Sequence, residues 1–169
     1  MRLFLAIELS DKIKKEINRQ LEEIKKAYPQ FQWVPADNYH ITVYFFGEIF
    51  DPKKIIKKLE QILYDKELFY LYSTSVNLTI QNKITLDLNF RREKEIERIS
   101  ESIKNEFQMT QNSEKYVPRL TLANYKIPSK QQYFVIKKRL SNLDTDISFK
   151  VNKLSLFEGE KRIRVFKLI

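Results

Sequence analysis

The sequence predicts an α+β fold in which residues 1–169 form a single bilobal domain of two similar halves. Strand-like and helix-like segments alternate along the chain, without a linker or a low-complexity tract between them. Two short segments of matching pattern, around His40 and around Thr121, mark the centres of the two halves. The chain has 169 residues and is 43% hydrophobic, which suffices for the core of one compact domain.

The first half is predicted from the spacing of its apolar residues and from two helix starts. Ser10 can cap a helix whose apolar residues then recur every three or four positions, and Pro29 ends that helix. Asp51 supplies a second cap, and Pro52 fits the first helical position because it lacks only an N–H that would be unpaired there. The expected elements are a strand at 3–8, a helix at 10–29, a strand at 39–46 and a helix at 51–63.

The second half begins with two alternating apolar runs on either side of residues 81–83, which is the pattern of a β-hairpin. Two helical repeats follow, the second of which begins near Ser129. A turn at Glu158-Gly159 is expected to join the last two strands. The expected elements are strands at 76–80 and 84–90, a helix at 96–107, a strand at 116–124, a short helix at 129–140, and strands at 147–156 and 162–169.

The composition excludes several classes of site. Cysteine is absent and there is one histidine, so we expect no disulfide, no thiolate nucleophile and no metal. Two glycines cannot build a glycine-rich phosphate loop, so we expect no ATP or NAD cofactor. No segment reaches the roughly 20 apolar residues of a membrane span, and Glu8 interrupts the first apolar run too early for a signal peptide. We therefore expect a soluble, cytoplasmic protein without cofactor or membrane contact. We also expect a monomer, although the sequence itself does not give the oligomeric state.

The charge is compatible with a polyanionic partner but does not identify one. The formal net charge is +9, which suits RNA because phosphates attract lysine and arginine whatever the base sequence. Most of the positive charge is lysine spread over expected helices, where it also forms an ordinary solvated face. Charge alone leaves both interpretations open.

Two strand segments carry the candidate chemistry. Alternate side chains of a strand share a face, so we expect His40, Thr42 and Tyr44 on one side and the apolar residues between them, up to Phe45, in the core. By the same alternation, the second segment aligns Arg119, Thr121, Ala123 and Tyr125 on one face.

Together these rows suggest an oxyanion site. If a pseudo-two-fold relates the halves, two hydroxyls, an imidazole and a guanidinium meet in one cleft, where phosphate is the obvious ligand. Taken singly, strand threonines and a lone histidine are common in ordinary strands. The paired pattern carries the functional prediction.

Five segments of the chain also resemble a known family. They are MRLFLAIE (1–8), WVPADNYHITV (33–43), FGE (46–48), PRLTLAN (118–124) and LFEG (156–159). In their order and spacing these segments are similar to the 2H phosphoesterases, and within them to the RNA 2′,3′-cyclic phosphodiesterases, also called 2′-5′ RNA ligases. The resemblance runs over essentially the whole chain.

The resemblance implies a bilobal 2H phosphoesterase fold, with antiparallel sheets facing a central groove and helices outside. It further implies two His-x-Thr motifs that work without a metal. One histidine takes a proton from the attacking water, the other gives a proton to the leaving ribose oxygen, and the threonines hold the non-bridging phosphate oxygens. The implied partner is RNA or an oligonucleotide with a 2′,3′-cyclic phosphate or a 2′-5′ linkage.

The chain departs from this pattern at two positions. Arg119 replaces the second histidine, and Asn124 stands where many relatives place an arginine. Arginine cannot shuttle protons because a guanidinium does not give up its proton in proteins, but it binds phosphate well. The predicted site residues are His40, Thr42 and Thr121 as catalytic groups and Arg119, Tyr44 and Tyr125 as substrate contacts.

Three functions remain open from the sequence. The first is an RNA 2′,3′-cyclic phosphodiesterase-like protein whose hydrolysis is impaired because Arg119 replaces histidine. The second is an inactive module that binds RNA or nucleotides, and the third is a scaffold for protein contacts. Loss of one general acid or base typically lowers a rate by about 10²- to 10⁴-fold, so slow turnover is compatible with the first function.

Overall fold

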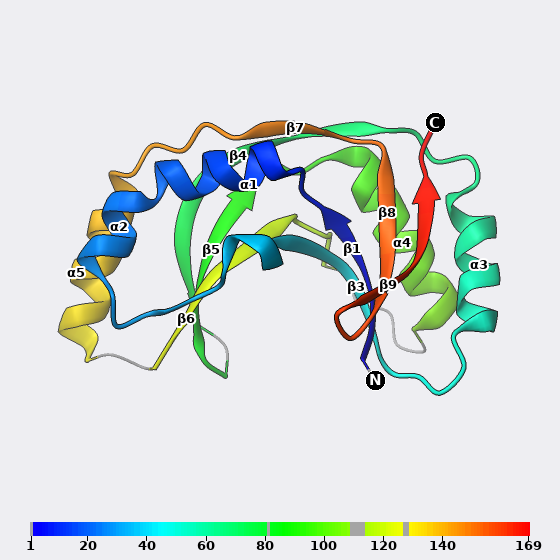
Figure 1. The fold of residues 1–169 in the computed structure, drawn as a ribbon, viewed down its shortest axis with the longest axis horizontal. Helices are drawn as coiled ribbons and strands as arrows, with labels where there is room; N and C mark the ends of the chain where they lie inside the picture. Colours follow the sequence, from blue (N-terminus) through cyan, green and yellow to red (C-terminus); the bar gives the residue numbers. More distant parts are fainter. Residues whose placement is uncertain (1, 81, 109–113, 127–128) are drawn as a thin grey trace.

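Two antiparallel sheets form the framework of the protein (Figure 1). The computed structural model describes residues 2–80, 82–108, 114–126 and 129–169, so the predicted turn at 81–83 lies partly outside the described residues. The first sheet has the strand order β3-β1-β8-β9 and the second β2-β6-β5-β4-β7. The elements are β1 (Arg2–Glu8), α1 (Asp11–Gln20), α2 (Glu22–Ala27), β2 (Gln32–Trp33), the 3-10 turn η1 (Ala36–Asn38), β3 (His40–Glu48), α3 (Lys53–Leu63), β4 (Phe69–Ile80), β5 (Ile84–Phe90), α4 (Lys94–Phe107), β6 (Arg119–Tyr125), α5 (Lys130–Ser141), β7 (Ser148–Val151), β8 (Lys153–Glu158) and β9 (Lys161–Lys167).

The helices lie outside the sheets, which gives the molecule the shape of an arch (Figure 1). Helices α3 and α4 pack together beside the first sheet, where α3 contacts β9 and α4 contacts β3. Helices α1, α2 and α5 lie beside the second sheet, and α5 contacts β4. The predicted α+β fold with two antiparallel sheets and outer helices is confirmed. Among the described residues, no helix is both long enough and apolar enough to cross a membrane.

The helix starts follow the predicted capping chemistry. Ser10 accepts a hydrogen bond from the Ile13 N–H, and Ser129 caps α5 in the same way. The third helix differs slightly, because Asp51 accepts from the Lys53 N–H and Pro52 occupies the N-cap position itself. The first helix also differs, since a turn at residue 21 divides the predicted segment into α1 and α2.

The prediction of one strand over 147–156 is wrong. The structure has two strands there, and they belong to different sheets: β7 pairs with β4 and β8 pairs with β1. The sequence contains the reason, because its apolar residues change from odd to even positions on either side of Asn152. Strand β8 then forms the predicted hairpin with β9, so the C-terminal segment completes the sheet that contains His40.

The core fixes which way the two motif strands face. Ile41 and Val43 of β3 are buried, as are Leu120 and Leu122 of β6. Burial of each such side chain stabilises the fold by roughly 1.5–3 kcal/mol relative to exposure. The polar residues between them are therefore held on the opposite face of each strand, away from the core.

Candidate active site

A groove of about 500 Å³ brings together four of the predicted site residues, namely His40 and Thr42 from β3 and Arg119 and Thr121 from β6. The two strands contact each other, so the motifs of both sheets meet at the same place as predicted. The groove is also lined by Thr85, Asp87, Lys104, Lys115 and Tyr116.

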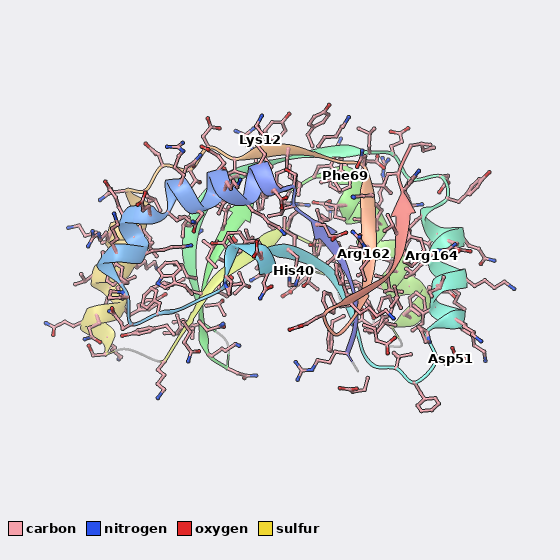
Figure 2. All side chains as sticks on the ribbon, in the orientation of Figure 1. Lys12, His40, Asp51, Phe69, Arg162 and Arg164 are labelled. Carbon is pink, nitrogen blue, oxygen red and sulfur yellow. The ribbon has the colours of Figure 1, made fainter. Side chains whose placement is uncertain are left out.

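His40 is held in a defined orientation by the chain just before β3. Its Nδ1 lies 2.9 Å from the carbonyl oxygen of Asn38, and a carbonyl can only accept, so Nδ1 carries a hydrogen. The Nε2 atom is therefore the nitrogen that can exchange a proton with a ligand. The ring of Phe4 lies 5.4 Å from the imidazole ring. Figure 2 shows His40 on the concave side of the arch, beside β3.

Each motif strand has a β-bulge one residue after its threonine. On β3, Thr42 pairs with Ala6 but Tyr44 pairs with Leu5, which leaves Val43 as the extra residue. A bulge interrupts the alternation of faces and bends the strand, and bulges are frequent beside active sites. Because directly paired residues share a face, Tyr44 lies on the buried side with Leu5.

The same irregularity occurs on β6. Thr121 pairs with Asp87 but Ala123 pairs with Leu86, so Leu122 is the extra residue. The two bulges lie at equivalent positions in the two motifs. This likeness is structural support for the predicted relation between the halves.

The predicted alternation of faces is consequently wrong beyond each threonine. Tyr44 packs against Phe107 of α4, and Tyr125 packs against Phe31, with its ring 4.4 Å away. Neither tyrosine lines the groove, and Tyr125 lines a separate pocket beside α5. Phe45, which was expected in the core, is 54% exposed. A role of the two tyrosines as substrate contacts stays a prediction.

Tyr116 joins the two sides of the groove. Its hydroxyl donates a 2.7 Å hydrogen bond to the carbonyl oxygen of Thr42, so the segment that precedes β6 is tied to β3. Burial raises the pKa of Tyr116, and the nearby guanidinium of Arg119 opposes this only in part. The phenol therefore stays protonated and serves as a fixed donor between the motifs.

Asp87 is a groove residue that the sequence analysis did not single out. It lies on β5 and is only 1% exposed. Its carboxylate accepts hydrogen bonds from the hydroxyls of Thr121, at 3.1 Å, and Thr85, at 3.0 Å. The available signal was an acidic residue at a polar position of an otherwise alternating strand, at 84–90.

This contact defines what Thr121 can offer a ligand. A hydroxyl has one proton, and that of Thr121 is donated to Asp87, so what this hydroxyl can still offer a ligand is its acceptor lone pairs. The resemblance implied that Thr121 donates to a phosphate oxygen. In the observed arrangement it would have to break its bond to Asp87 to do so.

Glu8 lies opposite His40 on the neighbouring strand β1 but is engaged elsewhere. It accepts a 2.5 Å hydrogen bond from the hydroxyl of Ser155 and pairs with Arg162 at 3.1 Å (Figure 2 labels Arg162). Burial alone would raise the pKa of Glu8, but the hydrogen bonds from Ser155 and Arg162 outweigh it, and the pKa is lowered. Glu8 is therefore an ionised structural group.

We expect Glu8→Gln to lower the free energy of unfolding at pH 7 by on the order of 1 kcal/mol, because a charged acceptor is lost. A lowered carboxyl pKa stabilises the fold above the pKa of the unfolded state, and this contribution disappears as the pH falls through the folded pKa. Urea titrations of both proteins at pH 7 and about pH 3 should show the difference shrinking. A difference that persists or grows at low pH would contradict the assignment.

Comparison with known proteins agrees with the motifs. A family model described as the 2′-5′ RNA ligase superfamily matches residues 10–162. The RNA 2′,3′-cyclic phosphodiesterase of Thermotoga maritima is 27% identical over 133 residues, which cover 75% of this chain and 71% of that protein. The enzyme of the same name from Methanocaldococcus jannaschii is 41% identical over 63 residues, or 37% of this chain and 32% of that protein.

Solved structures show the same fold. The chain is similar to Escherichia coli LigT complexed with 3′-AMP, with a TM-score of 0.72, 18% identity, and coverage of 99% of this chain and 97% of that one. A second similar structure, from Kluyveromyces marxianus, is Usb1, with a TM-score of 0.66, 10% identity, and coverage of 99% and 97%. The predicted resemblance to the 2H phosphoesterases is confirmed.

Proposed function

The chain belongs to the 2′-5′ RNA ligase superfamily, and on this basis we propose that it binds RNA ends carrying a 2′,3′-cyclic phosphate in the groove between its sheets and hydrolyses them slowly. A 2′-5′ linked oligonucleotide presents a similar phosphodiester and is the second ligand of this class. The observation that supports the proposal is the meeting of His40, Thr42, Arg119 and Thr121 in one groove.

The groove suits an anionic ligand. Arg119 offers a guanidinium, whose planar donors match two phosphate oxygens. Lys104 and Lys115 add positive charge, so basic side chains outnumber the acidic Asp87 and Glu114 in the lining. The formal net charge of +9 would further attract the RNA backbone.

Hydrolysis is proposed to be slow because only one imidazole is present. His40 can transfer one of the two protons that the reaction moves, while an arginine side chain at position 119 cannot serve as a proton carrier. Arg119 can still stabilise the negative charge that develops on the phosphate. The site thus keeps its binding groups and one of its two proton carriers.

We further propose that residues 1–169 work as one bilobal unit. The first sheet contains strands from both ends of the chain, since β1 pairs with β8, and the groove takes residues from both sheets. Neither half could complete its sheet or the groove alone.

The direct test uses a short RNA that ends in a 2′,3′-cyclic phosphate. This RNA is incubated with an excess of protein, and its mass is then measured. We expect slow conversion to a phosphomonoester one water heavier, at a rate that a metal chelator leaves unchanged. An RNA end that stays intact at high protein concentration would exclude the hydrolase. If the protein binds the cyclic-phosphate RNA but does not convert it, the inactive binding module is favoured. If the protein does not bind this RNA at all, the scaffold is favoured.

Arg119→Ala should weaken binding of a cyclic-phosphate RNA by about 1–3 kcal/mol, because one charge-assisted phosphate contact is lost. The dependence of log Kd on log salt should also decrease by about one unit of slope. Fluorescence anisotropy over a range of salt concentrations measures both. The matched control is Arg98→Ala on α4, since Arg98 pairs with Glu95 of its own helix. Equal effects of the two substitutions would contradict the role of Arg119.

A further inference from the structure

We propose that Asp87 and Thr121 together replace the missing second histidine as the proton acceptor for the attacking water. Thr121 would contact the water and Asp87 would act through Thr121 as its positioning residue. This inference rests on the proposed hydrolysis of a cyclic phosphate and identifies how the slow reaction is carried out.

The geometry places the carboxylate directly behind the threonine. Asp87 on β5 pairs in register with Thr121 on β6, so their side chains share the groove face. The Thr121 hydroxyl donates to one carboxylate oxygen at 3.1 Å, and Thr85 donates to the other at 3.0 Å. The neighbours Leu86 and Leu88 are buried on the opposite face, which prevents the strand from turning Asp87 away.

A purely structural role does not account for a carboxylate at this position. Burial of a charged group is costly unless strong partners compensate for it, and the hydrogen bonds that Asp87 accepts within the described part of the chain come from two neutral hydroxyls. An asparagine could bond both hydroxyls without that cost. A carboxylate also repels a phosphate, so it does not help a groove that only binds. A proton acceptor, in contrast, must be a base.

The proposed step balances. The water oxygen forms a bond to phosphorus while one ring P–O bond to the ribose breaks. The water proton passes to the Oγ1 of Thr121 as the Thr121 proton passes to Asp87, which becomes a carboxylic acid. The Nε2 atom of a protonated His40 gives its proton to the leaving ribose oxygen and becomes neutral. Both groups then return to their starting states by proton exchange with solvent.

The division of roles follows from the contacts already described. The Thr121 hydroxyl is committed to Asp87, so its lone pairs can accept a proton from water. Arg119 lines the same groove two residues before Thr121, where it can hold the phosphate without taking part in proton transfer. Acid and base thus come from opposite sides, with His40 on β3 and Asp87 on β5.

The test compares Asp87→Asn, Thr121→Val and the double variant with the wild type in single-turnover hydrolysis of a cyclic-phosphate RNA. We expect each single variant to lower the rate at least tenfold with Kd unchanged or improved, because a proton acceptor is lost and no phosphate contact is removed. The double variant should lose no more than either single one, since residues that act as a unit are not additive. Asp65→Asn, an exposed aspartate beside Lys66, is the matched control and should keep the wild-type rate.

The outcomes separate this inference from the proposed function. Wild-type turnover with an equally fast Asp87→Asn variant would overturn only the inference, as would rate losses that multiply in the double variant. A wild-type protein that does not hydrolyse the RNA would overturn both proposals. Thermal unfolding of each variant checks the fold. If Asp87→Asn does not fold, Thr121→Val remains as the test, because it keeps the carboxylate and its hydrogen bond to Thr85. A Thr121→Val rate equal to that of the wild type would then overturn the inference.

Discussion

Arg119→His is expected to raise the rate of cyclic-phosphate hydrolysis by about 100-fold or more, because a well-placed general acid or base contributes about 10²- to 10⁴-fold. Residue 119 lines the groove with His40 and Thr121, so the new imidazole would enter the place where the proton is transferred. The guanidinium contact with phosphate is lost at the same time. The rate should therefore increase while the affinity for the RNA decreases.

Arg119→Gln separates the two effects. Glutamine removes the charge as histidine does but cannot carry a proton at neutral pH. We expect Arg119→Gln to bind as weakly as Arg119→His without any gain in single-turnover rate. If the two variants hydrolyse the RNA equally fast, the missing histidine does not limit the wild-type reaction.

His40→Ala is expected to lower the hydrolysis rate about 100-fold or more, since His40 is the one imidazole of the chain. The hydrogen bond between Nδ1 and the Asn38 carbonyl holds the ring with Nε2 available for proton transfer. The single-turnover rate and the Kd for the RNA, measured for both the wild type and the variant, give the loss. The rate should fall while Kd changes little, because the imidazole acts mainly in the transition state.

Two further variants make this result decisive. His40→Asn keeps a side-chain donor near Asn38 but provides no proton carrier, so it should be as slow as His40→Ala. His40→Ala in the Arg119→His background should remove most of the gained rate. A gain that survives without His40 would show that the two positions do not form one site.

Local sequence patterns predicted most elements because they reflect local physics. Ser10 and Ser129 cap helices as expected, and the apolar spacing located the motif strands. The errors occur where the pairing of strands that are distant in the sequence determines which face a side chain lies on. Nothing local shows that Val43 and Leu122 are extra residues in their ladders, since a bulge is defined by the partner strand.

The candidate site was likewise predictable where local motifs define it, and not where strand pairing does. The repeated motif placed His40, Thr42, Arg119 and Thr121 together, and the structure brings them into one groove. Asp87 is not part of either motif, and it becomes a site residue only through the register of β5 against β6. The structure therefore adds a buried carboxylate to the groove, beside the threonine of the second motif.

The most direct test of the central claim compares two RNAs of identical sequence, one with a 2′,3′-cyclic phosphate end and one with free hydroxyl groups. Titration of each onto the wild-type protein, followed by fluorescence anisotropy on a timescale shorter than hydrolysis, gives two Kd values. We expect the cyclic-phosphate RNA to bind at least tenfold more tightly, a difference of about 1.4 kcal/mol, and Arg119→Ala to abolish the preference. Equal affinity for both RNAs would contradict a groove that recognises the phosphate end.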